Sequence, residues 1–388
     1  MRAVVAHGAG DFRLADVAEP VLAEGAGGAD AGGAGGAGGA GGAGSAIVGV
    51  EAAGVCAADR MIYAGDSPWE LTFPFVPGHE NVGRVLDIDP DAAARWGVTT
   101  GDLVVHEVMV PCERCPMCGR GLSHLCRAGL HLGSSLPGGW AERMWLPPEA
   151  RVWRVPDGLP PEEAVIAEPL ACAIHAVERA DPGSGDRVVV SGIGAIGAAA
   201  LAYLAAARPV GELVALVTSP ERAAVARELG ADHAIDVRAV DAAAAAEELR
   251  DRFEGIGPDI VIETSGHVES IELGLDAVRP GGRVVLYGVY RRRASVDWNV
   301  VAEFKELEVR GGHLAPGTFG QALELLARRD VDGRRLVTAS FPLEDVLAAL
   351  EEPRSGSRFT LKTILLPGRG VASAGRAEAA ASPRSNDG

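Results

Sequence analysis

A strand-like run that leads directly into a glycine-rich turn is the feature that most constrains the fold. The apolar segment Val188–Ser191 is followed by Gly192, Ile193, Gly194, Ala195, Ile196 and Gly197. A GxGxxG pattern is weak evidence alone, but between a strand and a helix it is typical of dinucleotide binding. Such glycines permit the tight turn, the approach of a pyrophosphate and close helix packing. The helix N-terminus then offers unpaired N–H groups and partial positive charge to the phosphates.

Strand-like and helical stretches alternate after about residue 181. The expected order is strand 187–191, helix 196–207, strand 213–218, helix 220–229, strand 260–263, helix 267–278, strand 283–287 and strand 307–311. This alternation predicts an α/β domain, residues 176–315, with a doubly wound parallel sheet of the Rossmann type and helices on both faces.

The second strand of this domain, residues 213–218, is where such a fold selects its cofactor. An acidic residue commonly ends the strand and binds the adenosine ribose hydroxyls, but none ends it here. Thr218, Ser219 and Arg222 are candidates to accept a 2′-phosphate instead, although Arg222 is equally consistent with a solvated helix residue. Gly288, after a later strand, is a further candidate to contact the cofactor. The choice between NAD and NADP stays open.

Short strands separated by Gly, Pro and Asp characterise residues 1–175, which we predict to be a β-rich domain. Within it, residues 23–44 are almost wholly glycine and alanine and are expected to form a flexible surface loop. A helix at 318–329 and a strand near 359–366 are expected to return the chain to this first domain over residues 316–367. The small, polar tail, 368–388, is expected to be disordered.

Four of the six cysteines lie within residues 112–126, namely Cys112, Cys115, Cys118 and Cys126. In a reducing compartment this spacing indicates a metal site rather than two disulfides. Tetrahedral zinc takes four thiolates at about 2.3 Å, and short spacings let one loop surround it. Because sulfur fills every position, the sequence predicts a structural zinc ion.

A second metal site is suggested by three separate turns. Cys56 follows a strand-like run, Pro77-Gly78-His79-Glu80 forms another turn, and Glu168 begins Glu-Pro-Leu. A cysteine, a histidine and a carboxylate would leave one position of a zinc ion open, which is typical of a catalytic site. Spacing alone makes this a weak inference.

The order of these motifs resembles the zinc-containing medium-chain alcohol dehydrogenases. The resemblance covers nearly the whole chain and rests on Gly54-Val55-Cys56, Gly78-His79-Glu80, Gly101-Asp102, the four cysteines, Gly138–Glu142, Glu168-Pro169-Leu170 and the glycine turn. The Glu-Pro-Leu form is similar to the sorbitol, threitol and threonine dehydrogenases. Residues 55–61 and 69–74 look most like polyol dehydrogenases acting on threitol or erythritol.

This resemblance implies a GroES-like catalytic domain beside the Rossmann domain, and two zinc ions per chain. It implies that Cys56 and His79 are catalytic zinc ligands, with Glu80 or Glu168 supplying the carboxylate. Cys172 is an alternative ligand, but we expect a buried free thiol.

The chain departs from the family where a proton relay is usual. It has Ala58 in place of Ser or Thr, and Met61 in place of a frequent His. A zinc-bound water held by either glutamate, or His175 acting through cofactor hydroxyls, are alternatives for moving the alcohol proton.

The predicted function is oxidation of a secondary alcohol of a small polyol by hydride transfer to NAD or NADP. One alternative is an amino-alcohol or aminocyclitol dehydrogenase, and another is a non-catalytic nucleotide-binding protein. The net charge of −17 argues against a nucleic-acid partner, and no apolar stretch is long enough for a membrane span. We expect a cytoplasmic protein without a signal peptide. The family resemblance implies a homodimer or homotetramer.

Overall fold

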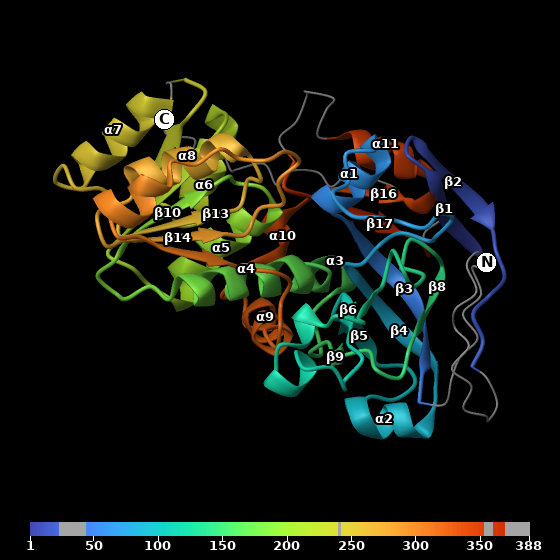
Figure 1. The fold of residues 1–388 in the computed structure, drawn as a ribbon. Coiled ribbons are helices and arrows are strands. Elements are labelled where there is room, and N and C mark those ends of the chain that lie inside the picture. The colour runs from blue at the N-terminus through green and yellow to red at the C-terminus, as the bar shows by residue number, and fades with distance from the viewer. Residues whose placement is uncertain (23–43, 240–241, 353–359, 369–388) are drawn as a thin grey trace, which may run out of the picture.

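The computed structural model describes residues 1–22, 44–239, 242–352 and 360–368. Two domains lie side by side, a sheet wound with helices and a β-rich domain (Figure 1). The predicted flexible loop, 23–44, and the predicted disordered tail, 368–388, lie outside the described residues except for Gly44 and Gly368. The predicted α/β fold class is confirmed by the architecture that follows.

The β-rich domain is built on a seven-stranded sheet in the order β16-β17-β3-β4-β5-β9, with β8 also paired to β3. Its strands are β3 (Ala46–Val55), β4 (Asn81–Ile88), β5 (Leu103–His106), β8 (Arg143–Leu146), β9 (Val152–Arg154), β16 (Val337–Pro342) and β17 (Lys362–Leu366). Two-stranded sheets pair β1 (Arg2–Gly8) with β2 (Asp11–Asp16), and β6 (Met109–Val110) with β7 (Leu130–His131). Because β17 pairs antiparallel with β3, residues 362–366 return the chain to the first domain.

Short helices that the sequence pattern did not predict connect these strands. They are α1 (Ala57–Ala64), α2 (Pro90–Trp96), α3 (Pro161–Ala164), α10 (Gly333–Leu336), α11 (Val346–Glu351) and the 3₁₀ turns η1 (Cys118–Arg120), η2 (Ser123–Leu125) and η4 (Leu343–Asp345). Several have local start signals: the Asp89 side chain caps α2, for example, and Pro90 occupies its first turn. They are too short for apolar periodicity to reveal them.

The second domain has six parallel strands in the order β12-β11-β10-β13-β14-β15. They are β10 (Arg187–Ser191), β11 (Glu212–Val217), β12 (His233–Asp236), β13 (Ile260–Glu263), β14 (Arg283–Leu286) and β15 (Glu308–Gly311). This corresponds to the order 3-2-1-4-5-6 of a Rossmann sheet. Its connecting elements are α5 (Ala195–Ala207), α6 (Pro220–Glu228), α7 (Ala242–Arg252), α8 (Val268–Ala277) and the π-helical turn η3 (Val300–Phe304).

Burial on both faces explains the uninterrupted apolar sequence of β10. Val188 and Val190 belong to one hydrophobic cluster, whereas Val189 belongs to the cluster on the opposite face. All three are fully buried, as expected of a parallel strand covered by helices on both sides.

The long helix α4 (Ala167–Ala180) contacts both α5 and α9 (Phe319–Ala327), and in Figure 1 it runs beneath the junction of the two domains. The predicted domain boundary between residues 175 and 176 falls inside this continuous helix, which ends at Asp181 in a left-handed conformation. No described helix is both long and apolar enough to cross a bilayer.

Candidate active site

The register of two neighbouring strands brings Cys56 and His79 together. β3 and β4 are antiparallel, and Ala53 lies opposite Asn81. The residues just after β3 therefore lie beside those just before β4, so Cys56 and the His79–Glu80 turn meet at one end of the sheet. A Cβ on Gly54 would lie 1.9 Å from a carboxylate oxygen of Glu80, so only glycine lets that side chain pack against β3.

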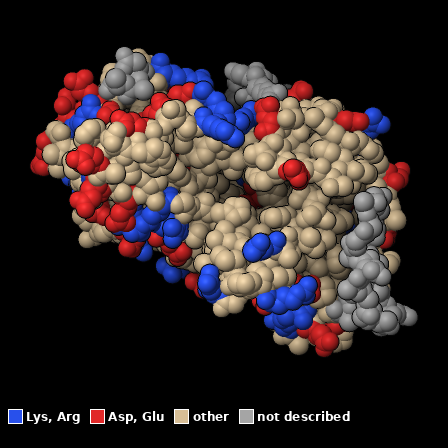
Figure 2. Space-filling model, in the orientation of Figure 1, with Lys and Arg blue, Asp and Glu red and all other residues tan. Residues whose placement is uncertain are grey.

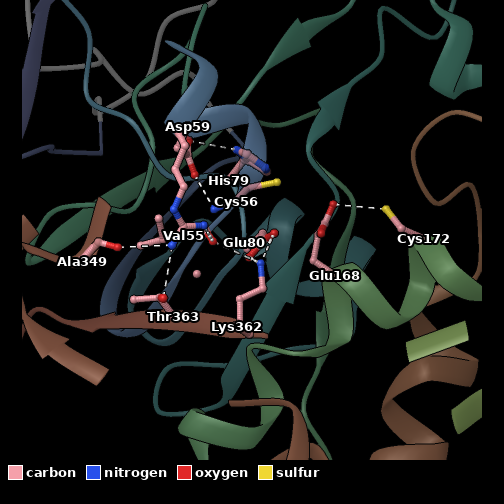
Figure 3. A network of polar contacts seen from close by, with 12 residues as sticks. Val55, Cys56, Asp59, His79, Glu80, Glu168, Cys172, Ala349, Lys362 and Thr363 are labelled. Carbon is pink, nitrogen blue, oxygen red and sulfur yellow. Dashed lines mark hydrogen bonds and ion pairs between the residues drawn. The ribbon is translucent and has the colours of Figure 1, made fainter. Parts of the chain in front are cut away.

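Cys56, His79 and Glu80 form a compact group of three metal-binding side chains. One ligand atom of each lies within 4.8 Å of the others. Thiolate, imidazole and carboxylate are the donors that zinc takes in catalytic sites. The residues present therefore fit a zinc ion, and three protein donors leave room for a fourth ligand (Figure 3).

Asp59 contacts both His79 and Cys56, and no sequence motif predicted this role. Its carboxylate lies 3.7 Å from Nδ1 of His79 and accepts the backbone N–H of Cys56 at 2.8 Å. Although burial opposes the charge, Asp59 and the hydrogen bond to Cys56 raise the pKa of His79 well above its usual value. The negative charge of Asp59 thus lies beside the imidazole, and a carboxylate next to a ligand histidine is usual in metal sites.

Lys362, at the start of β17, holds Glu80. Its Nζ lies 2.7 and 2.5 Å from the two carboxylate oxygens, and both side chains are buried. Burial alone would raise the pKa of Glu80, but the ammonium of Lys362 lowers it below its ordinary value. Glu80 is therefore both a member of the group and an ion-pair partner. Lys362 is one of only two lysines in the chain, and nothing in the local sequence indicated this role.

Glu168 lies outside the three-residue group and faces it from the first turn of α4 (Figure 3). Cys172, one turn later, donates its thiol to Glu168 over 3.4 Å. Burial and the charge of Glu80 raise the pKa of Glu168 to about 7. Cys172 is a buried free thiol, and its sulfur does not join the group of ligand atoms. Of the two predicted glutamates, the structure brings Glu80 together with Cys56 and His79.

The four cysteines of the second cluster converge as their spacing predicts. Their sulfur atoms lie within 4.8 Å of one another, and the closest pairs are 3.4 to 3.8 Å apart. Four thiolates at about 2.3 Å from one zinc ion would be about 3.8 Å apart. None of them is in a disulfide. The cluster therefore fits a closed tetrahedral zinc site.

The glycine turn has the shape of a pyrophosphate cradle. Gly192 has a φ of +89°, and a Cβ there would overlap Ser265. A Cβ on Gly197 would lie 1.9 Å from the carbonyl oxygen of Gly192, whereas one on Gly194 would meet nothing within 4 Å. Gly194 precedes α5, and no side chain caps that helix. Its first N–H groups thus adjoin open space, which suits the phosphates of a dinucleotide.

The remaining residues predicted for the cofactor adjoin this turn in different ways. The Ile193 side chain is buried, so its backbone is what can face a ligand, while Ala195 and Ile196 are partly exposed on the first turn of α5. A Cβ on Gly288 would lie 2.4 Å from the backbone nitrogen of Gly266, which shows how tightly the loops after β13 and β14 pack.

Comparisons with known proteins identify the family. The model of the alcohol dehydrogenase GroES-like domain matches residues 42–157, and that of the zinc-binding dehydrogenases matches residues 195–328. The chain belongs to the zinc-dependent alcohol dehydrogenases. It is 36% identical to an erythritol/L-threitol dehydrogenase of Mycolicibacterium smegmatis, over 95% of this chain and 98% of that protein. It is also 34% identical to an L-threonine 3-dehydrogenase of Pyrococcus abyssi, over 68% of this chain and 74% of that protein.

A solved structure agrees with this assignment. A zinc-binding dehydrogenase of Sinorhizobium meliloti bound to NADP superimposes with a TM-score of 0.81 at 25% identity, covering 94% of this chain and 99% of that one. The predicted family, enzyme class and use of zinc with NAD or NADP are confirmed. This dehydrogenase has a hollow between its two domains, with acidic atoms visible in its depth (Figure 2).

Proposed function

We propose that this dehydrogenase oxidises a secondary alcohol of a small polyol at the site formed by Cys56, His79 and Glu80. The observation that carries the proposal is the convergence of these three side chains within 4.8 Å. Retention of all three ligands argues against a non-catalytic nucleotide-binding protein, which would not need them.

Cys56, His79 and Glu80 would hold the catalytic zinc ion, and the four cysteines would hold the structural one. When bound, zinc lowers the pKa of an alcohol, and a nicotinamide accepts the hydride. Asp59 orients His79, while Lys362 keeps the Glu80 carboxylate ionised and fixed. The glycine turn and the N-terminus of α5 would bind the pyrophosphate.

Glu168 is the best placed residue to take up the alcohol proton. Ala58 and Met61 have no ionisable group, and burial lowers the pKa of His175 to about 4, which makes it a weak base. Glu168 has a pKa of about 7, close to the value that favours proton transfer at neutral pH. Together with Glu107 it lines a cavity of about 10 Å³, which is room for about one water molecule. A water molecule in that cavity would lie next to the Glu168 carboxylate.

A polyol is the preferred substrate class over an amino alcohol. The erythritol/L-threitol dehydrogenase is similar over almost the full length, whereas the threonine dehydrogenase aligns with about two thirds of the chain. The deciding test is a panel of polyols, cyclitols and amino alcohols assayed with NAD and NADP, together with a measurement of zinc per chain. Two zinc ions and turnover of tetritols are expected. Activity confined to amino alcohols, or a single zinc ion, would contradict the proposal.

The cytoplasmic enzyme would assemble through the free edge of β15. This strand is last in the sheet order, and the apolar side chains Trp298, Phe304 and Val309 near it are exposed. A second copy pairing along this edge would cover them and would satisfy the free backbone groups. Sedimentation analysis should show a dimer or tetramer, which Val309→Pro should weaken. A monomeric wild-type protein would disprove the assembly without touching the catalytic proposal.

A further inference from the structure

The loop that follows β14, residues 288–292, lies at the ligand-binding edge of the Rossmann sheet. Ligands of an open parallel sheet bind beyond the carboxyl ends of the strands, at the point where the strand order reverses. In this domain the order reverses between β10 and β13, and β14 pairs with β13 on the side away from β10. A dinucleotide whose pyrophosphate lies at the glycine turn after β10 would therefore extend towards this loop with its other half.

Glu263, the last residue of β13, fixes the first part of this loop to the sheet. It is fully buried, and its backbone carbonyl oxygen accepts the N–H groups of Tyr287 and Gly288 at 2.9 and 3.1 Å. Its carboxylate accepts the Tyr290 hydroxyl and, at 2.7 Å, the backbone N–H of Ser265. Burial and the charge of Glu263 raise the pKa of Tyr290, so the phenol stays protonated and can donate. The loop is therefore held at the end of β13 as far as Tyr290.

Arg291, the next residue, contacts the other domain. Its Nη1 lies 2.8 Å from a carboxylate oxygen of Asp66, which comes 225 residues earlier in the chain. Both side chains are about half exposed, so the ion pair lies at the surface. Asp66 directly follows Gly65, the C-cap of α1, and α1 lies on the side of the β-rich domain that faces the Rossmann domain (Figure 1). The ion pair thus joins the two domains beside the expected position of the cofactor.

Helix α1 connects this ion pair to the metal-binding group. Cys56 occupies the N-cap of α1, and Asp59 in its first turn accepts the backbone N–H of Cys56. At the other end the N–H of Asp66 donates to the carbonyl oxygen of Met61 at 2.9 Å. One helix of eight residues therefore lies between a predicted zinc ligand and the contact with the cofactor-binding domain.

We propose that Asp66 and Arg291 form a latch that holds the two domains together over the bound cofactor and slows its release. The inference goes beyond the proposed function, because it concerns the cofactor and not the alcohol. A cofactor enclosed between two domains leaves when they separate, and separation breaks a contact that spans them. Opening steps of this kind limit the turnover of many enzymes. Because an exposed ion pair contributes at most about fivefold to an equilibrium, the latch should adjust the release rate and not decide whether the cofactor binds.

The dissociation rate of the reduced cofactor tests the latch without any alcohol. NADH or NADPH, whichever binds more tightly, would be bound to the full-length, zinc-loaded protein and displaced by excess oxidised cofactor, with nicotinamide fluorescence followed by stopped flow. Asp66→Asn and Arg291→Gln should each release it about two- to fivefold faster than the wild type. Arg292→Gln removes the same charge from the neighbouring residue, whose ion pair with Glu269 lies within the Rossmann domain, and should release it at the wild-type rate.

A charge exchange distinguishes the ion pair from the loss of a side chain. The double variant Asp66→Arg with Arg291→Asp should return the release rate to within about twofold of the wild type. At about 0.5 M KCl the difference between the wild type and Arg291→Gln should shrink, because salt screens an exposed ion pair. Tyr290→Phe, which removes the hydroxyl bound by Glu263, should also speed release, and Asp66→Asn should add little to it.

The outcomes of this test are independent of the proposed function. Wild-type release rates in both Asp66→Asn and Arg291→Gln would overturn the latch, as would an equal acceleration in Arg292→Gln. Either result would leave oxidation of a polyol standing. Failure to oxidise any polyol would contradict the proposed function and leave a measured difference in cofactor release intact.

Discussion

The two clusters of metal-binding side chains differ in how the chain builds them. The four cysteines lie within residues 112–126 and use one loop, short 3₁₀ turns and sulfur alone. The second cluster combines Cys56, His79 and Glu80 with Lys362, so it exists only when β3, β4 and β17 are paired. A local cluster of four sulfurs would close around a zinc ion and add stability, whereas three donors in the assembled cluster would leave one zinc position open for chemistry.

The largest effect is expected on activity, from substitutions that break the assembled cluster. Cys56→Ser or His79→Ala should lower kcat/KM for the preferred alcohol by at least about a thousandfold, because a Lewis acid contributes several kcal/mol to the barrier. Zinc content should fall from two ions per chain to one, while circular dichroism stays close to that of the wild type. A variant that keeps most of its activity would show that zinc is held elsewhere.

A substitution in the cluster of four cysteines should lower the stability of the protein. Cys115→Ser should lower the free energy of unfolding by about 5 kcal/mol or more, because metal binding and folding of this loop are coupled. Urea denaturation followed by fluorescence measures the change. Cys172→Ser, at a buried thiol outside both clusters, should retain both zinc ions. If Cys115→Ser were as stable as the wild type, the loop would not depend on a metal.

Removing the lysine tests whether the assembled cluster also contributes to stability. Lys362→Met leaves the Glu80 carboxylate buried without its partner, which should cost about 3–5 kcal/mol of unfolding free energy. Lys362→Arg keeps the charge and should recover most of it. Equal stability of the methionine variant and the wild type would mean that Glu80 is satisfied by other groups.

A smaller effect is expected at Asp59, which touches the histidine rather than the reacting atoms. Asp59→Asn should reduce zinc affinity or kcat by about 10–100-fold, the usual effect of changing a group behind a metal ligand. A competition assay with a chelator measures the affinity. Loss of zinc from the cysteine loop in this variant would show that the two clusters are not independent.

The smallest effect on stability is expected at an ion pair that belongs to neither cluster of metal-binding side chains. Arg187 and Arg279 flank Asp259 at 2.9 and 2.6 Å, and despite partial burial they lower its pKa from 3.8 to about 2. Because the folded pKa is depressed, the contribution is present above about pH 4 and is lost as the pH falls towards 2. With solvent screening, Asp259→Asn should cost about 1 kcal/mol at pH 7. In urea titrations at several pH values, a difference that grew below pH 4 would contradict this assignment.

Particular residues show how far the sequence could be interpreted. The GxGxxG turn predicted the parallel sheet because each glycine meets a backbone requirement of a strand–turn–helix unit, and this pattern can be recognised in the sequence alone. The short spacing of the four cysteines predicted their cluster, because a single loop can bring all four sulfur atoms together. Short helices such as α1 escaped prediction because eight residues give too little periodicity. The roles of Asp59 and Lys362 escaped it because neither lies in a pattern with a chemical meaning of its own.

The sequence by itself determined the two domains, the pyrophosphate cradle and the sulfur cluster. Each is encoded in contiguous residues, and their spacing along the chain sets how they are arranged in space. Only the tertiary structure decided that Glu80, rather than Glu168, lies with Cys56 and His79. It also paired Glu80 with a lysine 282 residues away. The physical reason is that strand register, which brings such distant side chains within a few ångströms, depends on the packing of the whole sheet.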